Sequence, residues 1–260
     1  MLIIAAVLVL LVRAGRMAWS RRKLAVRIWR AIRPRHIIGS LGLVVIVLGV
    51  ALALLVFVPF TGVGLGQVVG LEGNAVFAPI DDALEAPLDA AVQAQETGAP
   101  PPGVPWTDVA AVTSFLAALV LMFPHLAHAE EAAFRSGWEK LNTRQQILSA
   151  FRFGMIHLIM LIPLAAALAV AVAGYVYGRI YVRAYHRAAR PRLVTPSGAL
   201  PRLAEDDQGL TRLVMGPPSP EYTVDQVAAR RQAVFDAAVW HATFNTTVAL
   251  LVWVGYILSF

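Results

Sequence analysis

Lysine and arginine are absent from a long stretch of this chain, from His36 to Phe134. All 22 of them fall into three blocks outside it, which run from Arg13 to Arg35, from Arg135 to Arg152 and from Arg179 to Arg231. Apolar runs separate these blocks, and 58% of the 260 residues are hydrophobic. Runs of this length and composition predict a polytopic, all-α membrane protein and exclude an ordinary soluble globule.

The same charge distribution predicts the topology. Basic residues favour the cytoplasmic side of a membrane, so we expect the three blocks in the cytoplasm and the middle of the uncharged stretch outside. Basic residues also serve nucleic-acid binding, but here they flank apolar runs, and anionic lipid headgroups explain them with fewer assumptions. We therefore expect membrane lipids as partners and no nucleic acid. The chain has no cysteine, which excludes disulfides, a thiol nucleophile and thiolate metal ligands.

Four regions follow from the apolar runs. Residues 1–36 are predicted to hold a short apolar segment and a basic helix lying on the inner leaflet, and whether residues 1–12 cross the membrane stays open. Residues 37–60 are a clear transmembrane span. Residues 61–106 carry six carboxylates and no cation, which predicts an external acidic loop. Its apolar first part, Val63 to Leu71, is expected to dip back into the membrane. Residues 107–260 form the membrane core.

Within the core we predict four further spans, for a helical bundle of about six spans plus interfacial or re-entrant helices. They are Asp108–Ala127, Arg144–Ile162, Pro163–Val182 and Ala233–Phe260. The middle two are separated at Pro163, because a single helix over both would be too long for the bilayer and would move a basic block outside. A polar insertion at 186–231, rich in proline, glycine and mixed charge, is predicted to be a flexible cytoplasmic loop.

Two adjacent carboxylates stand where the span that begins at Asp108 meets its cytoplasmic end. Glu131 and Arg135 are four residues apart and can pair on one helix face, whereas Glu130 points about 100° away. Charges in or just under the hydrocarbon are costly, so such carboxylates are functional candidates. A plain ion pair at the headgroups is the alternative interpretation of this stretch.

Two later spans each carry a pair of residues four apart: Phe153 with His157, and His241 with Asn245. This spacing places both members of a pair on one helix face. Taken singly, each histidine or asparagine more often forms a structural contact between helices. Taken together, a carboxylate, two imidazoles and a carboxamide are expected to converge in one polar pocket.

The ordered set EExxxR (Glu130, Glu131, Arg135), FxxxH (Phe153, His157) and HxxxN (His241, Asn245) resembles the CPBP intramembrane proteases. This family, also called Abi, includes the CAAX prenyl-protein endopeptidases. The resemblance covers roughly Asp108 to Phe260 and extends to a Gly174-x3-Gly178-x2-Tyr181 pattern. Two features depart from the family: the insertion at 186–231, where members usually have a short turn, and Ser136, where many have glycine.

The resemblance implies a metal-independent glutamic endopeptidase without a cofactor. Glu130 would activate the attacking water with help from His157, and His241 and Asn245 would stabilise the oxyanion. Glu131, Arg135 and Phe153 would support them structurally. The implied substrate is a peptide bond in a membrane-associated protein or peptide. The composition, rich in alanine, arginine and valine and without cysteine, suggests a bacterium, so we expect a multi-pass protein of the inner or plasma membrane.

Three alternatives stay open at this point. His125, His128 and Glu131 recur every three residues and could form a His/His/Glu metal cluster. A non-catalytic membrane scaffold or bacteriocin-immunity protein would use the same polar residues as contacts between helices. A transporter or channel is less favoured, because the polar residues cluster on one side and no matching pair of broken helices is present.

Overall fold

Four helices of the computed structural model are long and apolar enough to cross a membrane. They are α3 (Pro34–Phe57), α6 (Trp106–Arg135) together with the 3-10 turn η2 (Trp138–Lys140), α8 (Leu164–Ala188) and α9 (Gln226–Ile257). The structure describes residues 16, 20, 22–68, 92–93, 96–97, 104–189, 192–194, 201–205, 211–215, 221–223 and 225–258. The prediction of a helical membrane protein is confirmed, with four candidate spans among these residues in place of about six.

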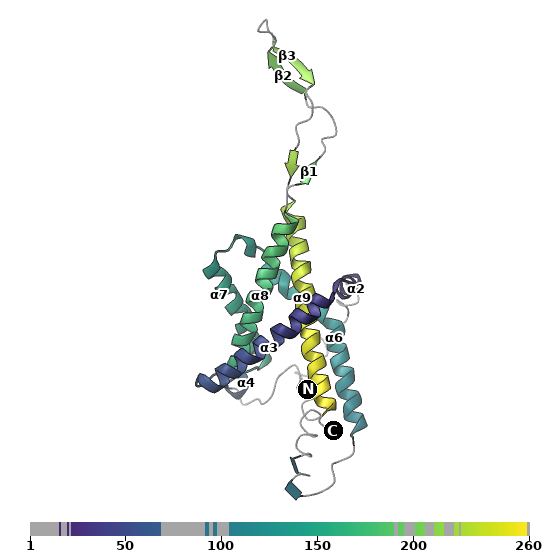
Figure 1. Ribbon diagram of the computed structural model, residues 1–260, viewed down its shortest axis with the longest axis vertical. Coiled ribbons are helices and arrows are strands. Elements are labelled where there is room, and N and C mark those ends of the chain that lie inside the picture. The colour runs from purple at the N-terminus through teal and green to yellow at the C-terminus, as the bar shows by residue number, and fades with distance from the viewer. Residues whose placement is uncertain are drawn as a thin grey trace.

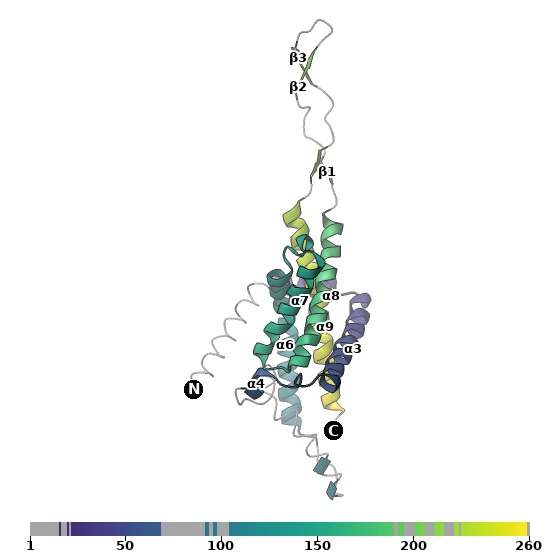
Figure 2. The same ribbon diagram turned by 90° about the vertical axis from the view of Figure 1, so that its left-hand side faces the viewer.

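Helices α8 and α9 form the centre of the bundle (Figures 1 and 2). In each of them, 44% of the most apolar 18-residue window is buried, against 17% in α3 and α6. Helix α6 packs on α9, α7 (Thr143–Ile156) packs on α8, and α3 lies across both central helices. Small residues let the two central helices approach closely. At this interface Ala184 of α8 shares one buried cluster with Ala233 and Ala237 of α9.

The chain enters the bundle through a basic helix, α2 (Arg22–Ala31), which packs against α6 and α9. Only Ile28 of α2 is buried, and its arginines are exposed. Arg33 is extended and Pro34 begins α3, where the missing N–H of proline costs no hydrogen bond. A basic helix in residues 1–36 is therefore present as predicted. Residues 1–12 lie outside the described part of the chain.

The predicted span Arg144–Ile162 is corrected. Helix α7 has only 14 residues, about 21 Å, and is followed by the 3-10 helix η3 (His157–Met160). Polar side chains such as Arg144 and Arg152 keep this stretch from being one of the four candidate spans. The break near Pro163 is present as predicted, because Leu161 turns the chain in the left-handed conformation and Pro163 caps α8.

The segment after α3 folds back onto the start of α8. The backbone N–H groups of Leu164 and Ala165 donate to the carbonyl oxygens of Val63 and Thr61, at 3.0 and 2.8 Å. A four-residue helix, α4 (Leu65–Val68), follows. This end of α3 therefore lies beside the N-terminal end of α8. Residues 69–71 of the predicted re-entrant segment, and most of the predicted external loop 61–106, lie outside the described residues.

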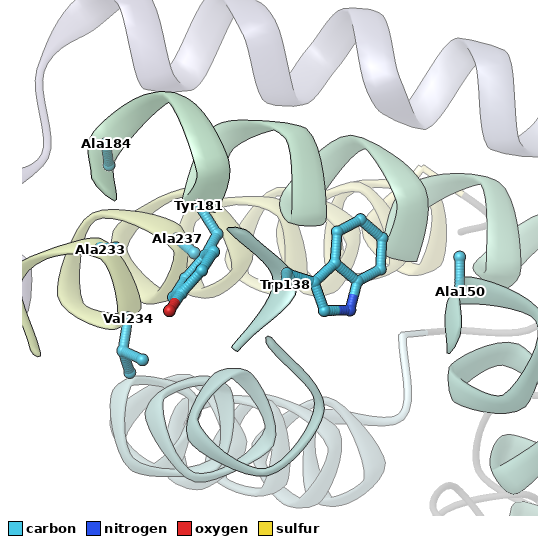
Figure 3. Close-up of a cluster of buried hydrophobic side chains, with 7 residues drawn as sticks. All are labelled: Trp138, Ala150, Tyr181, Ala184, Ala233, Val234 and Ala237. Atoms are coloured by element: carbon cyan, nitrogen blue, oxygen red, sulfur yellow. The ribbon is translucent and has the colours of Figure 1, made fainter. Parts of the chain in front are cut away.

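At the opposite end of the bundle, η2 is fixed by a hydrogen-bonded network. Arg230 Nε donates to Glu139 Oε1 at 2.7 Å, and the Tyr181 hydroxyl donates to Glu139 Oε2 at 3.0 Å. Trp138 and Tyr181 belong to one cluster of buried side chains (Figure 3). The Trp138 indole N–H donates to the Ser149 hydroxyl at 2.9 Å. The turn between α6 and α7 is thereby tied to α8 and α9.

The predicted flexible loop at 186–231 is corrected in its described parts. Helix α8 continues to Ala188, and two antiparallel strand pairs follow before α9 begins. Strand β1 (Arg192–Val194) pairs with β4 (Glu221–Thr223), and β2 (Pro201–Glu205) pairs with β3 (Thr211–Met215). Both strand pairs lie beyond the ends of α8 and α9 (Figures 1 and 2).

Candidate functional site

One cavity of about 350 Å³ brings the predicted catalytic residues together. It lies between α6, α7, α8 and α9, around the middle of the two central helices. Glu130, Phe153, His157, His241 and Asn245 all line it. The remaining wall is almost entirely apolar and includes Leu119, Phe123, Leu126, Met160, Val170, Phe244 and Val248. A small set of polar groups in an apolar cleft is the usual form of a binding or active site.

The two neighbouring carboxylates of α6 occupy different environments. Glu131 is fully buried, and its Oε2 lies 3.4 Å from Nε of Arg135, which is also fully buried. Glu130 lines the cavity with a side chain that is 34% exposed. Its Oε2 is buried and has no hydrogen-bond partner within the described residues. The 100° rotation between adjacent helical positions thus separates a structural carboxylate from one that faces the cavity.

The Arg135 guanidinium sits among aromatic rings. It lies 4.5 Å from the centre of the Phe153 ring and 5.0 Å from that of Trp138, which are favourable cation–π distances. Helix α8 makes room for this group with Gly174. A Cβ there would lie 2.6 Å from the Phe153 ring and 3.0 Å from an Arg135 nitrogen. Phe153 therefore has two roles, since it covers Arg135 and lines the cavity.

His241 joins the two carboxylates. Its Nδ1 lies 2.9 Å from Glu131 Oε1, and its Nε2 lies 3.6 Å from Glu130 Oε2. A carboxylate at Glu131 only accepts hydrogen bonds, so Nδ1 carries the hydrogen and donates. The ring stacks on Tyr177, with the centroids 4.6 Å apart and the planes 18° apart. The orientation of His241 is thus fixed by a hydrogen bond from one side and a ring face from another.

His157 is held by its own helix. The chain switches from α7 to η3 at this residue, and His157 Nδ1 lies 2.7 Å from the carbonyl oxygen of Phe153. A carbonyl only accepts, so Nδ1–H donates and Nε2 is the nitrogen available to another group. The Phe153 and His157 rings pack edge to face at 4.8 Å. The FxxxH spacing therefore fixes both the tautomer and the direction of His157.

Asn245 follows His241 by one helical turn on α9 and lines the same cavity. Both side chains project from one face because they are four residues apart. This face of α9 points at α6 and α8, the helices that carry Glu130 and Tyr177. The cavity lining thus includes a carboxylate from α6 and a carboxamide from α9.

Two features of the site were not predicted from the sequence. Tyr177 is fully buried and stacks on His241, and Glu131 contacts His241 in addition to Arg135. The position of Tyr177, three residues after Gly174 and four before Tyr181, could have indicated that it shares their buried face. The contact of Glu131 with His241 joins residues 110 apart in the chain, and no local pattern reveals it.

The alternative metal cluster is corrected. Glu131 is engaged by Arg135 and His241, and neither His125 nor His128 lines the cavity. Among the residues that the structure describes, no three His, Asp or Glu side chains are grouped as a metal ion requires.

Comparisons of the chain with protein-family models, with curated proteins and with solved structures give no match.

Proposed function

We propose that this chain is a metal-independent intramembrane endopeptidase of the CPBP type. One observation carries the proposal: Glu130, His157, His241 and Asn245, from three different helices, line a single cavity within the membrane-spanning bundle. The sequence resemblance suggested these residues from their order alone. Their convergence gives a general base, proton-transfer groups and hydrogen-bond donors for acyl hydrolysis.

In the proposed reaction Glu130 accepts a proton from a water molecule as the water oxygen attacks the peptide carbonyl carbon. His157 orients this water through Nε2, since its Nδ1 is occupied by the Phe153 carbonyl. The Asn245 amide donates to the oxyanion that forms on the carbonyl oxygen. Collapse of this intermediate breaks the C–N bond, and the proton held by Glu130 passes to the leaving amine.

His241 can contribute in two protonation states. Its Nδ1–H donates to Glu131, so Nε2 donates to an oxyanion only when the ring carries hydrogens on both nitrogens. In the neutral ring, Nε2 accepts a proton instead. The 3.6 Å distance between His241 Nε2 and Glu130 Oε2 suits proton exchange between the two side chains through a small rearrangement. In this proposal Glu131 orients His241, as the buried aspartate does in a Ser-His-Asp triad.

The apolar wall of the cavity supports a membrane-associated protein or peptide as substrate. Phe123, Met160 and Phe244 surround the polar residues and fit hydrophobic side chains next to the scissile bond. The basic residues near the α6–α7 turn and at the start of α9 favour the cytoplasm for that end of the bundle. We infer a multi-pass protein of the bacterial inner or plasma membrane.

The test is to search for new protein termini by mass spectrometry in membranes that contain the chain, its Glu130→Gln variant or its Asp108→Asn variant. Asp108 lies at the other end of α6, outside the cavity, and serves as the matched control. We expect new termini with the original chain and with Asp108→Asn, and none with Glu130→Gln, although all three proteins fold. Termini that persist with Glu130→Gln would contradict the assigned base.

A scaffold or immunity protein is the second candidate, and the buried contacts of Glu131 with Arg135 and His241 favour it. The Glu131–Arg135 pair lies within α6, and the Glu131–His241 contact joins α6 to α9 whether or not any bond is hydrolysed. In a scaffold, Glu130→Gln keeps its shape and is silent in every assay. The absence of any Glu130-dependent terminus, together with unchanged partner binding, would select this function.

A further inference from the structure

A second cavity, of about 230 Å³, lies where the junction of α2 and α3 meets the last turns of α8 and the early turns of α9. It shares no lining residue with the first cavity. Its charged lining consists of Arg33, Arg35, Arg187 and Asp236. Three guanidinium groups therefore face one carboxylate, which gives the cavity an excess of positive charge.

The single carboxylate neutralises little of this charge. Asp236 Oδ2 lies 3.5 Å from a terminal nitrogen of Arg187, and their side chains are 32% and 64% exposed, so the pair is weak. Asp236 also accepts from Gln232 Nε2 at 2.7 Å. Within the described residues, Arg33 and Arg35 pair with no carboxylate. Arg35 Nε instead contacts His36 Nε2 at 3.3 Å.

The backbone adds to the positive potential. Helix α3 begins at Pro34 beside this cavity and has no acidic residue in its first turn. The first N–H groups of a 24-residue helix carry a partial positive charge that favours an anion. The cavity thus combines two arginines that lack a carboxylate partner among the described residues with a helix N-terminus that has no acidic residue in its first turn.

The other wall is aromatic, as in many sites at a membrane surface. Phe235 and Trp240 line it, and the Trp240 ring packs edge to face on His36 at 4.8 Å. Tryptophan is enriched at the level of lipid headgroups. The α3 residues that follow, Ile37 and Ile38, are exposed and apolar, as expected for side chains that face acyl chains. The charged cavity suits the headgroup of a phospholipid, and the apolar surface of α3 that follows it suits the acyl chains.

We propose that this cavity binds the phosphate group of an anionic phospholipid headgroup. Arg33, Arg35 and Arg187 supply the hydrogen-bond donors, and arginine forks match phosphate oxygens in geometry. Basic pockets between transmembrane helices are known to hold such headgroups on the cytoplasmic side. Free phosphate shares this chemistry but lacks the acyl chains that would contact α3. This site is independent of the proposed hydrolysis.

The test measures the thermal unfolding of the full chain in a neutral detergent. Three additives are compared: short-chain phosphatidylglycerol, short-chain phosphatidylcholine and inorganic phosphate. A ligand that binds the folded state raises the unfolding temperature in a concentration-dependent way, which gives an apparent affinity. The test variant is Arg33→Gln with Arg187→Gln. The matched control is Arg183→Gln with Arg231→Gln, which removes two exposed arginines of α8 and α9 that do not line the cavity.

We expect phosphatidylglycerol to stabilise the original chain and the control, and to bind the test variant roughly 30-fold more weakly. If inorganic phosphate raises the unfolding temperature as much as phosphatidylglycerol does, and this rise is lost in the test variant, the cavity binds phosphate but its ligand is the free anion. Equal stabilisation of test and control variants by phosphatidylglycerol would overturn the site. No response to either anion by the original chain would also overturn it. The single Arg187→Gln variant provides the comparison if the double variant does not fold.

Discussion

Nδ1 of His241 and Oε1 of Glu131 lie 2.9 Å apart, although the two residues are separated by 110 positions and belong to α9 and α6. Glu131 Oε2 also lies 3.4 Å from Arg135 Nε. One buried carboxylate therefore contacts a guanidinium on its own helix and an imidazole on the neighbouring helix. The stability of the bundle and the orientation of a candidate catalytic residue therefore depend on the same side chain.

Replacing Glu131 by glutamine is expected to destabilise the protein strongly. The substitution leaves the buried Arg135 charge without its partner, which typically costs about 3–5 kcal/mol. Chemical unfolding in mild detergent measures this loss. Glu130→Gln is the matched control, because Glu130 is partly exposed and forms no ion pair with lysine or arginine in the part of the chain that the structure describes. Similar unfolding curves for the two variants would show that the Glu131–Arg135 pair is not important for stability.

Gly178→Ala is expected to destabilise the bundle by about 1–3 kcal/mol, because the new methyl group overlaps the Trp138 ring. Gly49→Ala on α3 is the control, since nothing lies within 4 Å of the added Cβ. There we expect a neutral effect or a gain of up to about 1 kcal/mol from helix propensity. The difference between the two unfolding free energies is the measurement. Equal effects would mean that α8 and η2 do not pack as closely as described.

The insertion between α8 and α9 is expected to be dispensable for folding. Strand β1 follows α8 and pairs with β4, which precedes α9. Arg192 and Thr223 are therefore adjacent, and a short linker can join the helix ends. Replacing residues 190–224 by a short glycine–serine linker should change the unfolding temperature by no more than about 4 °C. Size-exclusion chromatography and thermal unfolding check this. Aggregation of the shortened chain would show that the insertion stabilises the helices.

The sequence predicted the parts of this molecule that depend on local spacing. The i,i+4 pairs correctly indicated that Glu131 meets Arg135, and that His241 and Asn245 share a face. Apolar length located α3, α6, α8 and α9. The sequence did not reveal that α7 is too short and polar to be a candidate span. Its polar first turn continues directly into an apolar run, so no sequence boundary separates the two.

Contacts between distant helices were beyond sequence reasoning. The stacking of Tyr177 on His241 depends on how α8 packs against α9, which no spacing within either helix specifies. The paired strands of the insertion were missed for another reason. Proline, glycine and mixed charge around them predict a loop, and short hairpins give a weak periodic signal.

Substitutions of Tyr177 distinguish the role of its ring, which stacks on His241, from the role of its hydroxyl group. Its hydroxyl is buried and has no hydrogen-bond partner among the described residues, so Tyr177→Phe removes an unsatisfied group and keeps the ring. We expect Tyr177→Phe to unfold at the same temperature as the original chain or at a higher one. Tyr177→Leu removes the ring face that supports His241, and we expect Glu130-dependent cleavage to fall roughly 10- to 100-fold as the imidazole loses its position. Cleavage at a fixed temperature, measured beside thermal unfolding, checks both. Loss of cleavage in Tyr177→Phe without a change in stability would instead assign a chemical role to the hydroxyl.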